Sequence, residues 1–446
     1  AQALKQTQQW LPATPCAREP APVQIMYEES WAKGEDVQPA TLDAALEQPA
    51  MCFEVAGCLG SLRVIACLTK PIWKVAVQLQ PSFRTPFLYV LAGGLESGCA
   101  GVSLQVGTGR CRMLPPLSKT TDRSTDEISA EFSGNVRAVE LDGRLCAFTE
   151  TIDGRSKGYG LKIFEPRQRS WRECSLRQRG ELELVVSLDR WLYIFGRVQH
   201  DSGEWTLQLE RYNPFTDVRQ SLPPAPTSRC RSGVVSLDGC IYVIGGYAFG
   251  GTADEGPLHP LGIVECYDPA ENLWREVAPL SAPRFMCKAV AAGGSIYTIG
   301  GLDLQGHPPI ERYDPAIDTW TLVAPMPMQR CAVEVMEYRG SILAFGGLSA
   351  SGMATAAVEL YTPSTGTWRA LPAADFKTGG GPRYQLAMAA CAGGIYTVFT
   401  QDNWWKTDLV IQRYTEDSRM GSAGTPFCRL PVGRGHLCAV MVLAPE

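Results

Sequence analysis

Strong charge of either sign and histidine are both scarce in this chain. Its 446 residues carry a formal net charge of only −5, without the basic stripe of a nucleic-acid-binding protein or the polybasic patch of a membrane-surface protein. The four histidines, at His200, His259, His307 and His436, are scattered and lack the spacing of metal ligands. We therefore expect no nucleic-acid or membrane partner and no histidine-based metal site.

Several other signatures are missing as well. None of the 16 cysteines forms a C-x-x-C pair, and no asparagine begins an N-x-[ST] sequon. No apolar run approaches the ~18 residues of a transmembrane helix, and no signal peptide is visible. No G-x-S-x-G, P-loop or paired-carboxylate motif stands out, so we expect neither an enzyme nor a cofactor. These absences favour a cytoplasmic protein, with the nucleus also open, whose thiols are reduced. The first residue is Ala1, which leaves open whether a segment precedes it.

The most informative feature that is present is a repeated strand ending in two glycines. Clear copies cover Cys240–Gly246, Ser295–Gly301 and Ser341–Gly347. Fainter copies end at Gly93-Gly94, Thr149-Glu150, Gly196-Arg197 and Phe399-Thr400. From residue 94 to residue 400 is 306 residues, or six intervals of 51. Such a period predicts an all-β propeller of seven repeats, with six left open because three copies are degraded.

Each clear repeat predicts four antiparallel strands. In the fourth repeat these begin at residues 231, 240 and 264 and at Trp274, and Asp238-Gly239 makes the first hairpin turn. An aromatic residue of the third strand precedes a tryptophan by seven residues in four repeats, as in Tyr267 and Trp274. We expect these pairs to pack between blades and the glycines to permit close backbone approach near the central channel. In the third repeat Arg219 replaces the tryptophan.

This pattern resembles Kelch repeats, which combine the double glycine, a Tyr-Asp-Pro or Tyr-Asn-Pro turn, the spaced tryptophan and a closing Pro-Met or Pro-Leu. The resemblance implies a Kelch propeller over residues 81–446. Residues 1–80 are not Kelch-like, and we expect short helices at Leu4–Trp10 and Thr41–Gln48. This segment is a wrap on the propeller or the remnant of an upstream helical module. Residues 435–443 are expected to complete the first blade and close the ring, with residues 73–79 as the rival strand.

The propeller fold predicts where a binding face lies. Residues just after the glycines, and residues that lead into each first strand, should converge at one end of the blades. The predicted partner-binding residues are Arg197, Arg229, Arg231, Tyr247, Arg284, Phe285, Leu302, Arg330, Leu348, Arg383, Tyr384, Arg434 and His436. Guanidinium groups among aromatic side chains suit an acidic or C-terminal peptide.

Two alternatives stay open for these residues. The arginines that lead each repeat either contact a partner or form inter-blade ion pairs and cap turn carbonyls. Arg231 and Arg197 are the favoured contacts, because the repeat does not require an arginine at either position. The long loop from Tyr247 to Ile263 is either a contact element or a plain insertion.

The resemblance also implies a function. Kelch propellers most often recognise protein partners, and many are the substrate-binding part of cullin–RING ubiquitin ligase receptors. Cullin and adaptor subunits would then bind through residues upstream of this chain. The alternative is a cytoskeletal, actin-associated or complex-assembly scaffold. A copper oxidase related to Kelch propellers is disfavoured by the lack of paired histidines.

Overall fold

The chain divides into two compact units, residues 1–85 with 443–446 and residues 86–442. The computed structural model describes residues 85–92, 100–105, 110–115, 117, 136–153, 156–200, 205–248, 259–303, 306–349, 351, 353, 355, 357–371, 386–391, 394–403, 406–414, 426–432 and 437–444, apart from a few single positions within these ranges. The expected helices and the rival strand 73–79 lie outside them.

The described residues form seven four-stranded sheets, numbered 1 to 7 below in chain order. Every pairing whose register is defined is antiparallel. Sheets 1 to 3 contain β1 (Thr85–Ala92), β2 (Ala100–Gln105), β3 (Arg110–Met113) and β32 (Leu437–Ala444); β4 (Val136–Leu141), β5 (Arg144–Asp153), β6 (Ser156–Glu165) and β7 (Ser170–Arg179); and β8 (Glu181–Leu188), β9 (Trp191–Gln199), β10 (Trp205–Asn213) and β11 (Val218–Leu222).

Sheets 4 to 6 correspond to the three clear repeats, and sheet 7 corresponds to the seventh repeat. They contain β13 (Gly233–Leu237), β14 (Cys240–Ile244), β16 (Val264–Asp268) and β17 (Leu273–Val277); β18 (Lys288–Ala292), β19 (Ser295–Ile299), β20 (Glu311–Asp314) and β21 (Thr319–Leu322); β23 (Glu334–Tyr338), β24 (Ser341–Phe345), β26 (Val358–Thr362) and β27 (Thr367–Leu371); and β28 (Leu386–Cys391), β29 (Gly394–Asn403), β30 (Lys406–Tyr414) and β31 (Pro426–Val432).

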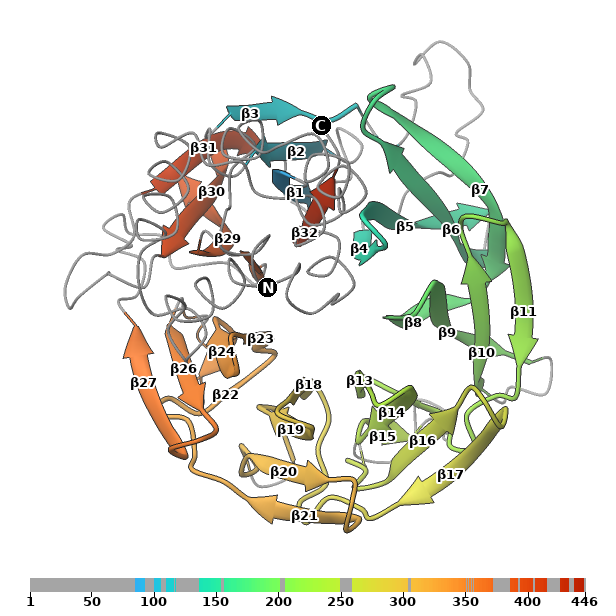
Figure 1. Ribbon diagram of the computed structural model, residues 1–446, viewed down its shortest axis with the longest axis vertical. Helices are drawn as coiled ribbons and strands as arrows, with labels where there is room; N and C mark the ends of the chain where they lie inside the picture. Colours follow the sequence, from blue (N-terminus) through green and yellow to red (C-terminus); the bar gives the residue numbers. More distant parts are fainter. Residues whose placement is uncertain are drawn as a thin grey trace, which may run out of the picture. The chain divides into compact units, whose positions relative to one another are not determined.

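The sheets are arranged radially, with first strands innermost and fourth strands outermost (Figure 1). First strands of neighbouring sheets contact each other in the series β4, β8, β13, β18, β23 and β28. The predicted four-stranded antiparallel repeat is therefore confirmed. In sheet 1 the order is β3-β2-β1-β32, which brings the C-terminal strand beside β1. That the seven sheets are blades of one closed ring stays a prediction.

The core lies between sheets rather than within one of them. One buried cluster joins Ile299 and Ile310 of sheet 5 to Ile342 and Tyr361 of sheet 6. Similar clusters join sheets 2 and 3, 3 and 4, 4 and 5, and 6 and 7. Each sheet therefore buries its apolar faces only against its neighbours, as in other repeat architectures.

The aromatic residue and tryptophan spaced by seven residues lie directly opposite each other on the third and fourth strands. Tyr313 and Trp320 are register partners whose ring centroids lie 5.0 Å apart. The Trp320 indole N–H donates to the carbonyl of Ala278 in the preceding sheet at 2.7 Å. Trp171, Trp274 and Trp368 donate to the preceding segment in the same way. The predicted inter-sheet role of this spacing is confirmed.

Arg219 preserves the link at the position where the tryptophan is missing. Its guanidinium donates to Glu210 of its own sheet and to Gln178 of sheet 2. A polar bridge thus replaces the indole-to-carbonyl bond.

The regular pairing of the second and third strands ends at the glycine doublet. Gly245 and Gly246 have φ of +61° and +100°. A Cβ on Gly245 would lie 2.5 Å from the carbonyl oxygen of Arg284, and one on Gly246 would lie 2.7 Å from that of Cys230. The close approach that we expected is present, but it is to the segments leading into sheets 4 and 5.

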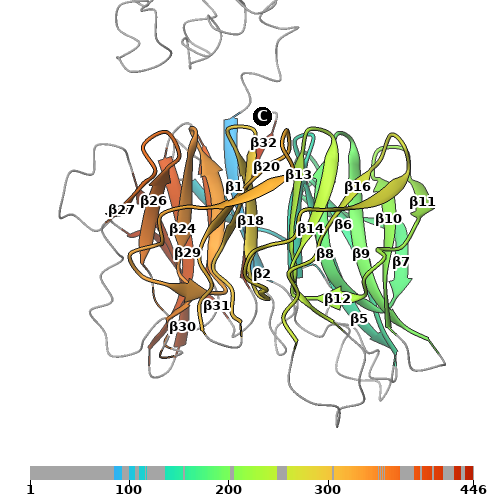
Figure 2. The same ribbon diagram turned by 90° about the horizontal axis from the view of Figure 1, so that it is seen from below.

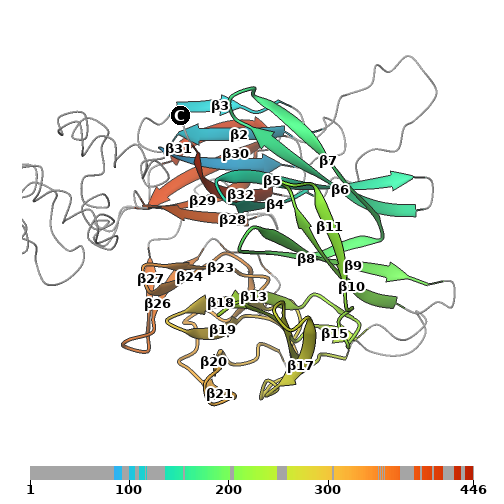
Figure 3. The same cartoon turned by 45° about the vertical axis from the view of Figure 1, so that its right-hand side comes forward.

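Where the doublet is missing, the pairing of the second and third strands continues past the equivalent position. The β9–β10 pairing runs through Gly196 and Arg197 to Gln199 and Trp205. The β5–β6 and β29–β30 pairings likewise run on through the degraded positions. Figure 3 shows the ends of the β5–β6 and β9–β10 hairpins projecting on one side of the sheets.

Candidate recognition face

Three arginines that lead the clear repeats are buried. Arg229, Arg284 and Arg330 have exposed fractions of 0% and pair with Glu265, Glu311 and Glu359 of their own sheets at 2.5, 2.5 and 2.6 Å. Burial lowers the pKa of Arg229 below the usual arginine value, while the charge of Glu265 opposes that shift. Each pair is therefore a dry, mutually neutralising ion pair.

The arginines of these pairs also donate to backbone carbonyls near the glycine doublet. Arg229 donates to the carbonyls of Ile263 at 2.9 Å and of Gly245 and Val243 at 3.3 Å. Arg284 and Arg330 reach the equivalent carbonyls, those of Pro309 at 2.6 Å and Ala357 at 3.0 Å. The Ile263 and Ala357 carbonyls also accept the backbone N–H groups of Gly245 at 3.0 Å and Gly346 at 2.9 Å, so the arginine adds a second donor where the regular pairing ends.

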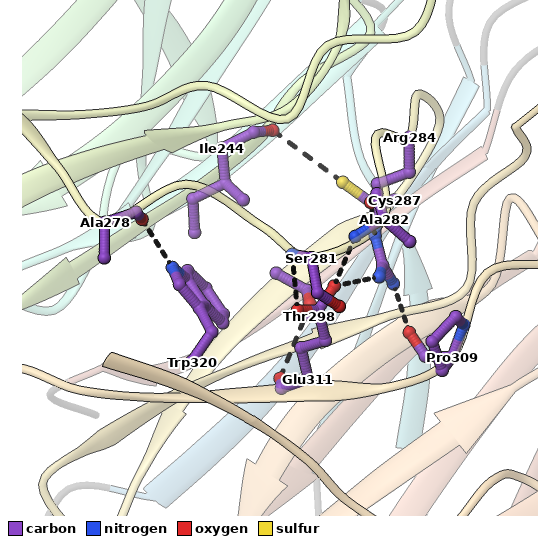
Figure 4. A network of polar contacts seen from close by, with 10 residues as sticks. All are labelled: Ile244, Ala278, Ser281, Ala282, Arg284, Cys287, Thr298, Pro309, Glu311 and Trp320. Atoms are coloured by element: carbon purple, nitrogen blue, oxygen red, sulfur yellow. Dashed lines mark hydrogen bonds and ion pairs between the residues drawn. The ribbon is translucent and has the colours of Figure 1, made fainter. Parts of the chain in front are cut away.

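The carboxylates also hold the connection that leads from one sheet to the next. Glu311 accepts the backbone N–H of Ser281 at 2.8 Å in addition to the guanidinium of Arg284 (Figure 4). Thr227 donates to Glu265 at 2.6 Å, and the Met328 N–H donates to Glu359 at 3.2 Å.

The expectation that these three arginines contact a partner is corrected by their burial. A guanidinium with no exposed surface, held by a carboxylate and by carbonyls, is not available for binding. The other interpretation, ion pairing with capping of turn carbonyls, is the one that the contacts support.

The predicted convergence of the leading segments with the residues after the glycines is present in all three repeats. β12 (Arg229–Cys230) pairs with β15 (Tyr247–Ala248), and β22 (Arg330–Cys331) pairs with β25 (Leu348–Ser349). In sheet 5, Phe285 and Leu302 form the equivalent isolated bridge. β12 lies at the lower end of the sheets in Figure 2. We call this end, with its leading segments and its connections between second and third strands, the loop face.

Among the predicted contact residues of the loop face, one exposed arginine lies with partly accessible apolar groups. Arg231 is exposed, and Tyr247, Phe285, Leu302 and Leu348 are half-buried. The rings of Tyr247 and Phe285 meet edge to face at 5.7 Å. Met353, in the connection after β25, is 67% exposed. The long loop after Tyr247 lies partly outside the described residues.

Arg197, the other favoured contact, is held by its own hairpin. Its side chain is 15% exposed and pairs with Glu181. Its guanidinium lies over the Trp205 ring, 4.9 Å from the centroid. Because these contacts occupy it, we no longer treat it as equivalent to Arg231. The remaining predicted residues, Arg383, Tyr384, Arg434 and His436, lie outside the described residues.

Sequence reasoning missed the acidic partners. A glutamate stands two residues before the third-strand tyrosine in four successive repeats, at Glu210, Glu265, Glu311 and Glu359. That recurrence was readable from the sequence and pairs naturally with a recurring arginine. Glu183 was also missed, and no repeat pattern marks it.

We also searched the described residues for metal ligands, membrane-spanning helices, histidine contacts and clefts. They contain no group of three or more potential metal ligands, and none of their elements is a helix suited to crossing a membrane. His200 contacts Thr206 at 2.9 Å, and His307 contacts the Gly301 carbonyl at 3.2 Å. A polar cleft of about 470 Å³ between sheets 3 and 4 is lined by Arg211 and the β16–β17 turn, at the opposite end of the sheets from the loop face.

Comparison with known proteins agrees with the repeat pattern. The Kelch motif family model matches residues 228–281 and 283–327. The chain is 30% identical over 160 residues to Kelch repeat and BTB domain-containing protein 12 of Danio rerio, covering 34% of this chain and 25% of that protein. It is 43% identical over 169 residues to Kelch-like protein 23 of Mus musculus, covering 37% and 27%. Beta-scruin of Limulus polyphemus is 31% identical over 121 residues, covering 27% and 13%.

The chain thus spans only a minor part of each of these relatives. Two of its clear repeats, those of sheets 4 and 5 with their glycine doublets, buried Arg–Glu pairs and inter-sheet tryptophans, lie in the region that the Kelch model matches. The comparisons therefore identify Kelch repeats in this chain, over residues 228–281 and 283–327.

Proposed function

We propose that this chain is a protein-recognition module, a seven-bladed Kelch propeller that binds a segment of a partner protein on the loop face. One observation carries the proposal: leading segments and post-glycine residues pair in three successive sheets, with Arg231 exposed among apolar side chains. In this proposal the propeller spans residues 81–446 and β32 closes it beside β1, while residues 1–80 are a separate segment.

The chemistry of the face suits a protein ligand. Interface anchors are enriched in arginine, aromatic residues and methionine, and the loop face offers Arg231, Tyr247, Phe285 and Met353 together. An arginine among apolar groups favours a segment that carries a carboxylate, either an acidic side chain or the end of a chain. We expect neither catalysis nor a cofactor at this face.

The cellular role that we favour is substrate recognition for a cullin–RING ubiquitin ligase in the cytoplasm or nucleus. Support comes from the similarity to Kelch-like proteins and to one whose name includes a BTB domain. Cullin and adaptor subunits would bind through parts outside the propeller. A scaffold that associates with actin is the alternative, and it would use the same fold without ligase subunits.

Site-specific photo-crosslinking tests the proposal. A photoreactive amino acid replaces Tyr247 on the loop face, or Leu273, which is 63% exposed on the outer strand β17. We expect partner crosslinks from position 247 and few from position 273, and Arg231→Ala should abolish those from position 247. Equal crosslinking from both positions would contradict a recognition role for the loop face.

The same preparations separate the two cellular roles. Cullin and adaptor subunits that co-purify with the full-length protein support the ligase receptor. Co-sedimentation with filamentous actin, without those subunits, supports the scaffold.

A further inference from the structure

Three residues of the loop face share an unusual backbone conformation. Arg231, Met286 and Ala332 each lie two residues after a buried leading arginine, and their φ values are +52°, +56° and +50°. Residues other than glycine rarely adopt this left-handed region and keep it only where their surroundings hold it. Contacts of the backbone at these positions therefore decide where the side chains point.

Arg231 is held by contacts to both neighbouring sheets. Its backbone N–H donates to Oε1 of Glu183, in sheet 3, at 2.6 Å. Its carbonyl accepts the backbone N–H of Met286, in sheet 5, at 2.8 Å. The Arg231 side chain then lies along sheet 5, with Nη1 3.4 Å from the Met286 sulfur.

Glu183 reaches Arg231 because of an irregularity in its own strand. The register of β8 with β9 shifts between Leu182 and Leu184, so Glu183 is the extra residue of a β-bulge. Bulges redirect a side chain and recur next to functional sites. The clear repeats do not predict this feature, because sheet 3 is one of the degraded ones.

A second exposed arginine lies beside Glu183. Arg137, in β4 of sheet 2, donates from Nη1 to the Glu183 carbonyl at 2.6 Å. Burial raises the pKa of Glu183, whereas the Arg231 N–H and the charges of Arg137 and Arg231 act in the opposite direction. Two exposed guanidinium groups thus flank one half-buried carboxylate, which leaves this part of the loop face with excess positive charge.

We propose that Glu183 is a positioning residue for Arg231, and that Arg231 and Arg137 bind one side-chain carboxylate of the partner segment while Met286 contacts an adjacent apolar residue. The inference rests on the proposed function and specifies its ligand. Glu183 acts through the backbone of Arg231, so its acceptor oxygen matters more than its charge. Arg137 supplies donors beyond the one that the Glu183 carbonyl accepts.

Peptide binding provides the test of the ligand. Peptides of 12 residues are selected from a random library on the wild-type chain, then synthesised with a free or an amidated C-terminus. We expect selected peptides to contain Asp or Glu next to an apolar residue and to bind equally in both forms. Loss of binding on amidation would instead assign the site to a chain terminus and overturn the side-chain specificity.

Variants of Glu183 test the positioning role. Glu183→Ala should weaken peptide binding by about tenfold, comparable to Arg231→Ala, as expected for losing one charge-assisted hydrogen bond. Glu183→Gln keeps an acceptor oxygen and should bind within about twofold of wild type. The double variant Glu183→Ala with Arg231→Ala should bind no more weakly than Arg231→Ala alone, because Glu183 acts only through Arg231. Glu334→Ala is the matched control, because Glu334 also lies near the start of a first strand but pairs with the Lys288 side chain at 3.0 Å.

Amide hydrogen exchange supplies a readout that needs no peptide. The Arg231 amide should exchange faster in Glu183→Ala and stay protected in Glu183→Gln. Unchanged exchange and unchanged binding in Glu183→Ala would overturn the positioning role even if Arg231→Ala abolishes binding. If no peptide binds, or if binding ignores Arg231 and Tyr247, the proposed function fails, and amide exchange alone then decides the role of Glu183.

Discussion

At the residue scale, burial decides which arginines of the repeat are structural. Arg229 and Arg231 are two positions apart, yet the first has no exposed surface and the second is exposed. Arg229 enters the sheet to meet Glu265, whereas Arg231 turns outward in a left-handed conformation. The same residue type therefore serves the framework at one position and the loop face at the next.

The framework role predicts a large stability loss from one substitution. Arg284→Ala leaves Glu311 buried without its counter-charge, which should lower the free energy of unfolding by about 3–5 kcal/mol. Urea unfolding measures the change. The double variant Arg284→Met with Glu311→Leu should recover part of the loss, because no charge stays buried, although the Pro309 carbonyl and the Ser281 N–H lose their bonds to this pair. Arg231→Ala should cost no more than ~0.5 kcal/mol, and a similarly small cost for Arg284→Ala would contradict the assignment.

Glu183 predicts a pH dependence of stability. Burial raises its pKa above the usual value near 4.5 in the folded chain. Its contribution to stability is therefore fully present below that usual value and is lost as the pH rises through the folded-state pKa. Relative to Glu183→Gln, the wild type should become less stable over this interval, measured by urea unfolding at a series of pH values. A difference that is constant, or that grows in favour of the wild type, would refute the raised pKa.

At the element scale, the glycine doublet determines how far the hairpin between the second and third strands extends. With the doublet, the regular pairing of strands such as β14 and β16 ends, and a leading arginine donates to a carbonyl at that point. Without it, β9 and β10 stay paired well past the same position. The degraded repeats are thus complete four-stranded sheets with longer hairpins.

Alanine substitutions at two glycines of sheet 4 distinguish the cost of a left-handed backbone from the cost of a steric clash. Gly239→Ala, at φ +78° with nothing within 4 Å of the added Cβ, should cost only ~1–2 kcal/mol for the left-handed backbone. Gly246→Ala combines φ +100° with a Cβ 2.7 Å from the Cys230 carbonyl. We expect it to cost at least ~1 kcal/mol more, because the leading segment must move. Thermal or urea unfolding compares the two, and equal losses would argue against close packing as the reason for the doublet.

At the scale of the whole molecule, each sheet depends on its neighbours. The buried clusters span pairs of sheets, and the tryptophans of sheets 2, 4, 5 and 6 donate to the segment that precedes each of those sheets. An arrangement of this kind exposes apolar surface at any end that is left open, so closure should matter for stability.

Removal of the C-terminal strand tests closure. Deleting residues 437–446 takes away β32, the neighbour of β1 in sheet 1. We expect a lower Tm, a less cooperative transition and association through the exposed β1 edge, measured by calorimetry and light scattering. Deleting only residues 445–446, beyond the end of β32, should change neither. A truncated chain that unfolds like the full one would mean that β32 does not close the propeller.

Much of the fold and part of the candidate site could be predicted from local patterns. The doublet period located the clear repeats, and the seven-residue spacing of Tyr313 and Trp320 identified opposite positions on neighbouring strands. The convergence of Cys230 with Tyr247 followed from the repeat topology. These features could be predicted because strand alternation, turns and repeat spacing depend on residues close together in the chain.

The roles of the arginines and of Glu183 required the tertiary structure. The sequence by itself determined that an arginine leads each clear repeat, but the contact with Glu265, 36 residues away in the chain, determined that Arg229 is buried. Likewise, only the bulge in β8 and the contact between sheets 3 and 4 brought Glu183 to the backbone of Arg231, 48 residues on. The Arg–Glu recurrence was present in the sequence, but the burial of the pair and the contact between two sheets depend on how strands distant in the chain pack together, and no local pattern specifies that packing.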